Sequence, residues 1–346
     1  MRGKLVQIGL RGLSTVQVRQ VSAVPYDAAE GDVARVYREL ERDFGVLAPP
    51  VILHAPAPDV LAACWLMLRE VLLVPGSAPR AWKEAVCTAV SKSNECPFCI
   101  TMHDSMLTNL VGYRDGEIAD PSSRAAAAWA GAAGVSAPFT AEQTPELVGT
   151  AVIMQYLNRM VNIFLGEVPL PPGAPRSALA VVRRVLVWLI KSAERAGPRP
   201  GTSLDLLPEA ELPEDLSWAA TNSAIAGAYA RSAAVIEEAG RRSVPPAVRE
   251  LVLASLEGWD GRPLGLSRAW VEDAVGELEV PDRPAGRLAL LTALASYQVD
   301  QTAIDEFRST APDDRALIDL TAWSSLTTAR HLGSLLRIPS EAGAAG

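Results

Sequence analysis

Apolar residues recur every three to four positions along most of the chain, the spacing that places them on one face of an α-helix. The pattern predicts helices over residues 27–44, 59–73, 79–93, 96 onward, 122–134 and 145–165. We expect Asp27 to cap the first helix, Gly45 to end it, and Pro79 to open the third. No stretch alternates apolar and polar residues between turns, as a half-buried strand would. The sequence therefore predicts an all-α fold, a bundle of amphipathic helices.

Two segments rich in proline divide this pattern. The first is PLPPGAPRS at 169–177, and the second, GPRPGTSLDLLPEAELPED at 197–215, is long enough to link two folded halves. The helices after the second segment repeat those before it in order. PRAWKEAVCTAV aligns without a gap with PPAVRELVLASL, and TAVIMQYLNRMVNIFL aligns with TAWSSLTTARHLGSLL. We expect a tandem duplication, with one domain at 1–196, a linker at 197–214 and a second domain at 215–346.

The composition limits the classes of protein that fit. Apolar residues make up 49% of the chain, and the net charge of −8 is a poor match for nucleic acid, which requires a basic face. Four cysteines in 346 residues are too few for a secreted disulfide scaffold. The N-terminus carries charges throughout, and the most apolar later run, 177–190, is interrupted by Arg183 and Arg184. These features predict a soluble, cytoplasmic protein with no membrane partner.

The segment SNECPFCITMH at 93–103 concentrates reactive side chains. Cys96 is predicted to lie at a helix start, where free amide groups and the helix dipole stabilise a thiolate. Cys99 follows three residues later, and His103 lies one turn further along the same face. If the preceding helix folds back as a hairpin, Glu84 faces His103 and raises its basicity. The imidazole can then deprotonate the thiol, and a second thiol is present to close a redox cycle.

The second half does not repeat this chemistry. The positions that align with the two cysteines and the histidine are Arg262, Gly265 and Ala269. The fold can evidently be made without the reactive residues, which favours a functional role for the first-half cluster. The remaining cysteines, Cys64 and Cys87, lie among apolar residues at helical spacing, and we expect them to belong to the core.

The spacing of EAVCTAVSKSNECPFCITMH resembles the alkylhydroperoxidase D-like, or carboxymuconolactone decarboxylase, family, with looser similarity over most of residues 25–165. The resemblance implies an all-helical fold that oligomerises. It also implies a thiol peroxidase, in which Cys99 attacks a hydroperoxide and Cys96 resolves the sulfenic acid as a disulfide, with Glu84 and His103 as the relay. The implied reductant is a dihydrolipoyl or similar dithiol. Phe98 departs from the family pattern, because these enzymes often have a second histidine there.

The resemblance also gives the second half an expected role. Members of the family are usually short chains that assemble by packing helical faces against identical copies. The repeat would supply such a face within one chain, so that two tandem alkylhydroperoxidase D-like bundles form a pseudo-dimer. Independent domains on a linker are the alternative. We further expect a homo-oligomer with no cofactor and no metal, whose chemistry belongs to the first half alone.

Other interpretations of the cluster stay open. The cysteines could be ordinary packing residues, or Cys96, Cys99, His103 and Glu84 could hold a structural zinc ion. The same fold could also serve a non-catalytic redox sensor or scaffold, in which the cysteine pair oxidises but turns over poorly. A carboxymuconolactone decarboxylase-like reaction fits less well, because those decarboxylases commonly lack the cysteine pair. Turnover with a dithiol reductant distinguishes the peroxidase from the sensor.

Overall fold

The computed structural model describes residues 2–166, 184, 185, 187–191, 193 and 197–339, and helices dominate them. The all-α fold expected from the sequence is therefore confirmed. The helices of the first half are α1 (Arg2–Val16), α2 (Gly31–Glu39), α3 (Pro49–Ile52), α4 (Pro58–Leu68), α5 (Arg80–Ser93), α6 (Pro97–Leu110), α7 (Pro121–Gly131) and α8 (Thr144–Phe164). Those of the second half are α10 (Ser223–Ser243), α11 (Pro246–Leu256), α12 (Ala269–Val275), α13 (Arg283–Ala295), α14 (Gln301–Thr310) and α15 (Asp314–Ser334).

The ends of several helices were predicted correctly, but the start of the first predicted helix, 27–44, was not. Asp27 lies in a separate 3-10 turn, and α2 begins at Gly31 after Glu30, with no side-chain cap. Asp27 is too far upstream, because a capping side chain must directly precede the first helical residue. The predicted end at Gly45 is right. A π-helical turn carries α2 on to Phe44, and Gly45 then adopts a φ of +91°, which glycine tolerates best.

A short hairpin was not predicted at all. The strands β1 (Tyr113–Arg114) and β2 (Glu117–Ile118) pair antiparallel, joined by Asp115 and Gly116, which both have positive φ. Such a two-residue Asp-Gly turn is a strong hairpin signal, but its strands are too short for an alternating pattern. The proline-rich break predicted at 169–177 lies outside the described residues.

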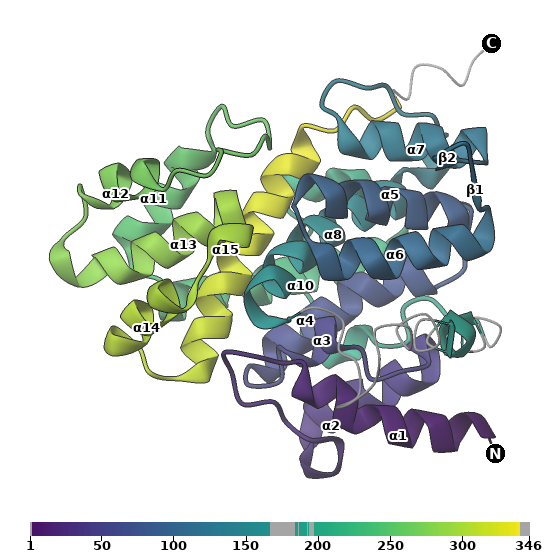
Figure 1. Ribbon diagram of the computed structural model, residues 1–346, viewed down its shortest axis with the longest axis horizontal. Coiled ribbons are helices and arrows are strands. Elements are labelled where there is room, and N and C mark those ends of the chain that lie inside the picture. The colour runs from purple at the N-terminus through teal and green to yellow at the C-terminus, as the bar shows by residue number, and fades with distance from the viewer. Residues whose placement is uncertain (1, 167–183, 186, 192, 194–196, 340–346) are drawn as a thin grey trace.

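The two halves pack around shared helices. In Figure 1, α5, α6 and α7 lie together on one side and α11 to α14 on the other, with α8, α10 and α15 between them. Helix α8 packs along α15, with which it aligns in sequence, and α4 packs along α10. One hydrophobic cluster of buried side chains continues through both halves, from Val33 to Ala329. The halves are therefore joined by a continuous apolar core.

Polar contacts also cross between the halves. The Tyr229 hydroxyl on α10 donates to the carbonyl of Gly149 on α8 at 2.6 Å. Gly149 suits this close packing, because a β-carbon at its position would lie only 2.6 Å from Val71. The segment 197–214, which we expected to be a linker, runs along the first half. There the Ser203 hydroxyl donates to Glu39 at 2.7 Å, and the Gly201 amide donates to Glu70 at 3.0 Å.

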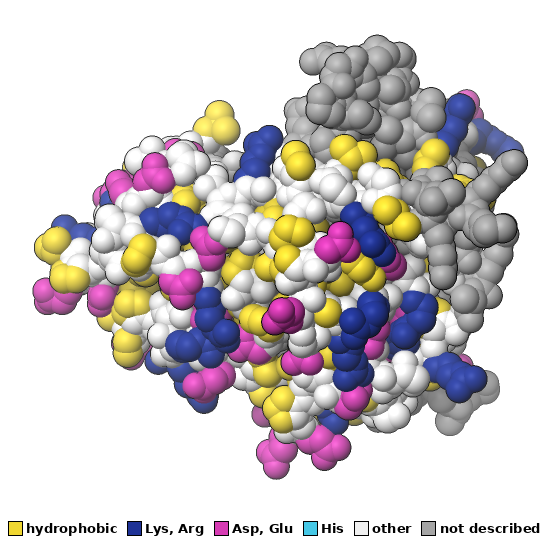
Figure 2. All heavy atoms as spheres, turned by 90° about the horizontal axis from the view of Figure 1, so that it is seen from below, with side chains coloured by type: hydrophobic (Ala, Val, Ile, Leu, Met, Phe, Trp, Pro, Cys, Tyr) yellow, Lys and Arg dark blue, Asp and Glu magenta, His cyan; other side chains and the backbone are white. Residues whose placement is uncertain are grey.

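The second half departs from the first where the reactive residues would be. Residues 257–268, between α11 and α12, contain no helix. The first part of α6, residues 97–102 with Cys99, thus has no helical counterpart, and α12 begins only at Ala269, the position that aligns with His103. None of the described helices is long and apolar enough to cross a membrane. On the face shown in Figure 2, basic and acidic side chains are interspersed rather than gathered by sign.

Candidate active site

A tight helical hairpin brings the predicted reactive residues together. Helix α5 stops at Asn94, Glu95 takes a left-handed φ of +49°, and Cys96 then occupies the position before α6. The Cys96 amide donates to the carbonyl of Ser91 at 3.0 Å, which closes the turn. Pro97 suits the first helical position because it has no amide proton to satisfy. The hairpin turns the middle of α5 towards α6, which is the condition under which we expected Glu84 to face His103.

Glu84 is the charged residue at the centre of this hairpin. It is fully buried, and its Oε1 accepts hydrogen bonds from Arg80 Nε at 2.8 Å and Nη2 at 2.6 Å. Its Oε2 lies 2.8 Å from His103 Nδ1. Burial alone would raise the pKa of Glu84, but the charges of Arg80 and His103 outweigh it and lower the pKa to about 2. Glu84 is therefore a carboxylate at neutral pH.

His103 takes the opposite charge. Burial opposes protonation, but Cys87 and Glu84 favour the imidazolium and raise the pKa of His103 to about 10. The Nδ1–H consequently donates to Glu84, which fixes the orientation of the ring. His103 has 18% of its side chain exposed and lines the pocket described below. At neutral pH it can give a proton to a group in that pocket.

The two thiols of the Cys-x-x-Cys motif differ in position and in acidity. Cys96 is completely buried, whereas Cys99 is 4% exposed and lines the pocket. A hydrogen bond from the Cys99 thiol lowers the pKa of Cys96 despite its burial, with help from the charge of His103. The shared proton and burial raise the pKa of Cys99 well above its ordinary value. Cys96 is thus the more readily ionised thiol of the pair and Cys99 the less readily ionised one.

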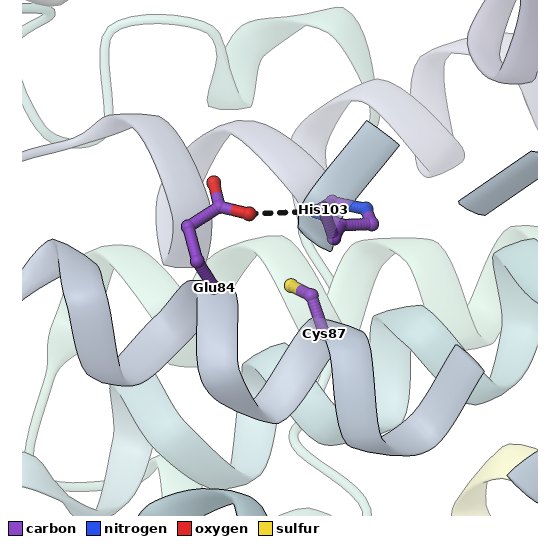
Figure 3. Close-up of side chains that lie close together, drawn as sticks. All are labelled: Glu84, Cys87 and His103. Carbon is purple, nitrogen blue, oxygen red and sulfur yellow. Dashed lines mark hydrogen bonds and ion pairs between the residues drawn. The ribbon is translucent and has the colours of Figure 1, made fainter. Parts of the chain in front are cut away.

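Cys87 is buried, as expected for a core residue, but it also belongs to this site. Its sulfur, a carboxylate oxygen of Glu84 and a ring nitrogen of His103 all lie within 4.8 Å of one another. Figure 3 shows Cys87 and Glu84 rising from the same helix towards His103. The signal was present in the sequence, because residues three apart share a helix face. We had assigned Cys87 to the core from its apolar neighbours alone.

This cluster is a poor site for a metal ion. It excludes Cys96 and Cys99, the two thiols on which the zinc alternative depended. The guanidinium of Arg80 already neutralises Glu84 at 2.6 Å. A cation placed among the three side chains would therefore lie next to a buried positive charge, and it would have to displace the proton that His103 shares with Glu84.

Asn158 on α8 is another member of the site that sequence reasoning missed. Its side chain is completely buried and forms hydrogen bonds that help to stabilise the ionised forms of both Cys96 and Cys99. Asn94 Nδ2 donates to Asn158 Oδ1 at 3.1 Å. This hydrogen bond orients the Asn158 amide, so that its own Nδ2 points away from Asn94 and donates to Ser91 Oγ at 3.2 Å. No pattern in the sequence links Asn158 to the thiols, since only the packing of α8 brings them together.

A largely apolar pocket opens above the reactive groups. Its volume is about 1110 Å³ including the open mouth, and its polar lining includes Arg80, Glu84 and His103. The apolar lining comes from several elements: Leu10, Leu13, Phe44, Val46, Leu68, Leu72, Phe98, Met102, Met106, Met154, Leu157 and Ile190. Phe98, which stands where related enzymes often have a second histidine, thus contributes apolar surface next to Cys99.

The fold and the site together define a class of protein. A helical hairpin that carries a buried glutamate, a Cys-x-x-Cys pair and a histidine beside a pocket is typical of alkylhydroperoxidase D-like proteins. The chain is 36% identical over 337 residues to the alkyl hydroperoxide reductase Rv2159c of Mycobacterium tuberculosis, and the match covers 94% of this chain and 96% of that protein. No family model matches the chain. At this similarity, which extends through both halves, the chain belongs to the alkylhydroperoxidase D-like family together with that relative.

Proposed function

We propose that the protein is a thiol-dependent hydroperoxide reductase that uses Cys99 and Cys96 as its redox pair. The observation that carries this proposal is the arrangement of the two thiols, with Cys99 at the pocket and Cys96 hydrogen-bonded behind it. The Glu84–His103 pair, joined at 2.8 Å, supplies a positioned proton donor. The name of the mycobacterial relative supports the same reaction type.

The first step is attack of the Cys99 sulfur on the terminal oxygen of the hydroperoxide. In the reactive form Cys96 is ionised, and as Cys99 attacks, its thiol proton moves to the Cys96 sulfur along the hydrogen bond that joins them. The oxygen–oxygen bond breaks, and the departing alkoxide takes a proton from the His103 imidazolium to leave as an alcohol. Cys99 is left as a sulfenic acid, and His103 is left neutral.

The second step forms the disulfide. Neutral His103, still held by Glu84, accepts the proton from the Cys96 thiol, directly or through water. The Cys96 thiolate then attacks the sulfur of the Cys99 sulfenic acid, and the departing hydroxide takes the proton back and leaves as water. A dithiol such as a dihydrolipoyl group reduces the disulfide by exchange and restores the two thiols. Per cycle, one hydroperoxide and one dithiol give an alcohol, water and one disulfide of the reductant.

The pocket favours an organic hydroperoxide over hydrogen peroxide. Apolar side chains form most of its wall, and Phe98 and Met102 line it together with Cys99, all three from α6. Each methylene group that such a wall buries contributes about 0.8 kcal/mol to binding. Hydrogen peroxide has no apolar group to bury and gains nothing from this surface. We therefore propose alkyl hydroperoxides with an extended apolar group as substrates.

The test is consumption of a hydroperoxide with dihydrolipoamide as the reductant. Wild-type protein should turn over repeatedly, with a higher kcat/KM for an alkyl hydroperoxide than for hydrogen peroxide. Cys99→Ser should abolish consumption, whereas Cys64→Ser, which removes another buried thiol, should retain it. Oxidation that stops after one equivalent of peroxide would favour the redox sensor instead. Consumption by Cys99→Ser at the wild-type rate would contradict both readings.

A further inference from the structure

The surroundings of the His103 ring differ from those of an ordinary carboxylate–histidine pair. Glu84 holds Nδ1 at 2.8 Å, and the sulfur of Cys87 lies within 4.8 Å of both the ring and the carboxylate. Glu84 and Cys87 are separated by one helical turn on α5, and Figure 3 shows both side chains directed towards the ring. His103 therefore faces a carboxylate and a thiol from the same helix.

Neither the redox cycle nor core packing accounts for this placement. Cys87 is completely buried, and among the described residues the pocket lining includes Cys99, Glu84 and His103 but not Cys87. A hydroperoxide in the pocket therefore meets Cys99 and not Cys87. A packing role would be met by any small apolar side chain and does not require a sulfur within 4.8 Å of a charged ring.

We propose that Cys87 is a positioning residue of the active site, whose thiol acts as a second partner of His103 and, together with Glu84, fixes the orientation and positive charge of the ring. The effect of this role on catalysis rests on the proposed peroxidase function. The contact between Cys87 and His103 does not depend on that function. A sulfur beside the ring favours the imidazolium through a hydrogen bond and through any negative charge that the sulfur carries.

Several other titratable groups contact the partners of the ring or lie near it, and they set the reference for a test. From α5, Arg80 ion-pairs with Glu84, and Lys83 interacts with Cys87. From the start of α6, Cys96 and Cys99 form the hydrogen-bonded thiol pair described above. All of these groups are retained when Cys87 alone is replaced. A change in the titration of His103 in such a variant therefore reports on the thiol of Cys87.

The experiment is an NMR titration of the full-length protein labelled at histidine. The chain has 3 histidines, and His103→Gln assigns the signal of interest. Replacing Cys87 by Ala or by Val should lower the titration midpoint of His103 by about one pH unit, since a neighbouring group typically shifts a pKa by that much or more. Two apolar variants are used so that either one that folds provides the measurement. The signals of His54 and His331 report whether the fold is intact.

The matched control is Cys64→Ala, which removes a buried thiol from α4 instead and should leave the His103 midpoint unchanged. Cys87→Ser retains a hydrogen-bonding group and should give a smaller shift than Ala. A His103 midpoint that shifts as far in Cys87→Ser as in Cys87→Ala also supports the assignment. The shift would then come from the charge of the sulfur rather than from a hydrogen bond. A His103 midpoint that stays at the wild-type value in a folded Ala or Val variant overturns the proposal.

Kinetics then connect the contact to the reaction. If His103 acts as the proton donor, the alkaline limb of kcat/KM should move to lower pH in Cys87→Ala by the same amount as the titration midpoint. Wild-type protein that consumes no hydroperoxide would refute the proposed function and leave the titration result standing. The wild-type enzyme can be active while Cys87→Ala keeps the wild-type alkaline limb and the wild-type His103 midpoint. That result would refute the role of Cys87 and leave the proposed function standing.

Discussion

Replacing Glu84 by glutamine removes one buried charge and almost nothing else. Glutamine has the same length and shape, so the change creates no cavity. In the native protein one carboxylate oxygen accepts two hydrogen bonds from Arg80, and the other lies 2.8 Å from His103. The glutamine amide group must direct its nitrogen at one of these two cations, where it cannot accept a hydrogen bond. We expect the variant to fold with reduced stability.

The pKa of Glu84 gives the size of the effect. Arg80 and His103 lower it from 4.5 to about 2 in the folded protein, against the effect of burial. At 1.36 kcal/mol per pH unit, this difference corresponds to about 3 kcal/mol of stability. Because the folded pKa is below the unfolded one, the contribution is complete above pH 4.5 and is lost as the pH falls towards about 2. Glu84→Gln should therefore cost about 3 kcal/mol at pH 7 and progressively less below pH 4.5.

Urea unfolding followed by circular dichroism, under reducing conditions, measures this difference. Glu70→Gln is the matched control, because Glu70 is also a buried carboxylate beside an arginine, Arg69. In its case burial outweighs the arginine and raises the pKa, so neutralising Glu70 at pH 7 should cost less than neutralising Glu84. Equal losses in the two variants, or a Glu84→Gln protein as stable as wild type at pH 7, would refute the electrostatic reasoning.

Three further results are expected. Mild treatment with hydroperoxide should join Cys96 to Cys99, seen by mass spectrometry as the loss of two hydrogens from the peptide that carries both; thiols that remain alkylatable would rule this out. Asn158→Leu should slow formation of this disulfide by roughly 10-fold, because the thiolate loses a hydrogen bond worth about 1.5 kcal/mol, whereas an unchanged rate would show that the amide is only structural. Residues 1–196 expressed alone should aggregate or self-associate, and a stable, fully active monomer would contradict the pseudo-dimer.

The hairpin that forms the site could be predicted because its determinants are local. Asn94 and Glu95 interrupt the helical pattern, and Pro97 restarts it at a fixed distance. With the break located, the helical repeat alone brings Glu84 opposite His103. The charge on His103 could not be predicted in the same way. Our sequence interpretation made the imidazole a base, but its charge state depends on how completely Glu84 and Cys87 are buried around it.

The pocket could not be predicted, because its walls come from segments far apart in the chain. Leu10 and Leu13 belong to α1, whose charged sequence gave no indication that it would line a site. Phe44 and Ile190 approach from other parts of the first half. Such contacts depend on the packing of whole helices, and no local pattern encodes them. Asn158 escaped prediction for the same reason.

The second half contributes to the site through the helix it covers. Helix α8 supplies Asn158 on one side, while its other side packs along α15. Arg159, the next residue, donates to the carbonyl of Ala293 in the second half at 2.9 Å and to Asn94 Oδ1 at 3.2 Å. Asn94 is also the residue that orients the amide of Asn158.

These contacts indicate what a half without the reactive residues contributes to the site. Asn94 lies in the turn before Cys96, and it accepts a hydrogen bond from Arg159, which also donates to Ala293 in the second half. Removing the second half would expose the apolar faces of α4 and α8 and would also leave this buried arginine without one of its acceptors. We infer that the second half, in the place of a second subunit, acts as a scaffold for the thiol pair. Its loss should therefore impair the redox chemistry as well as the stability of the fold.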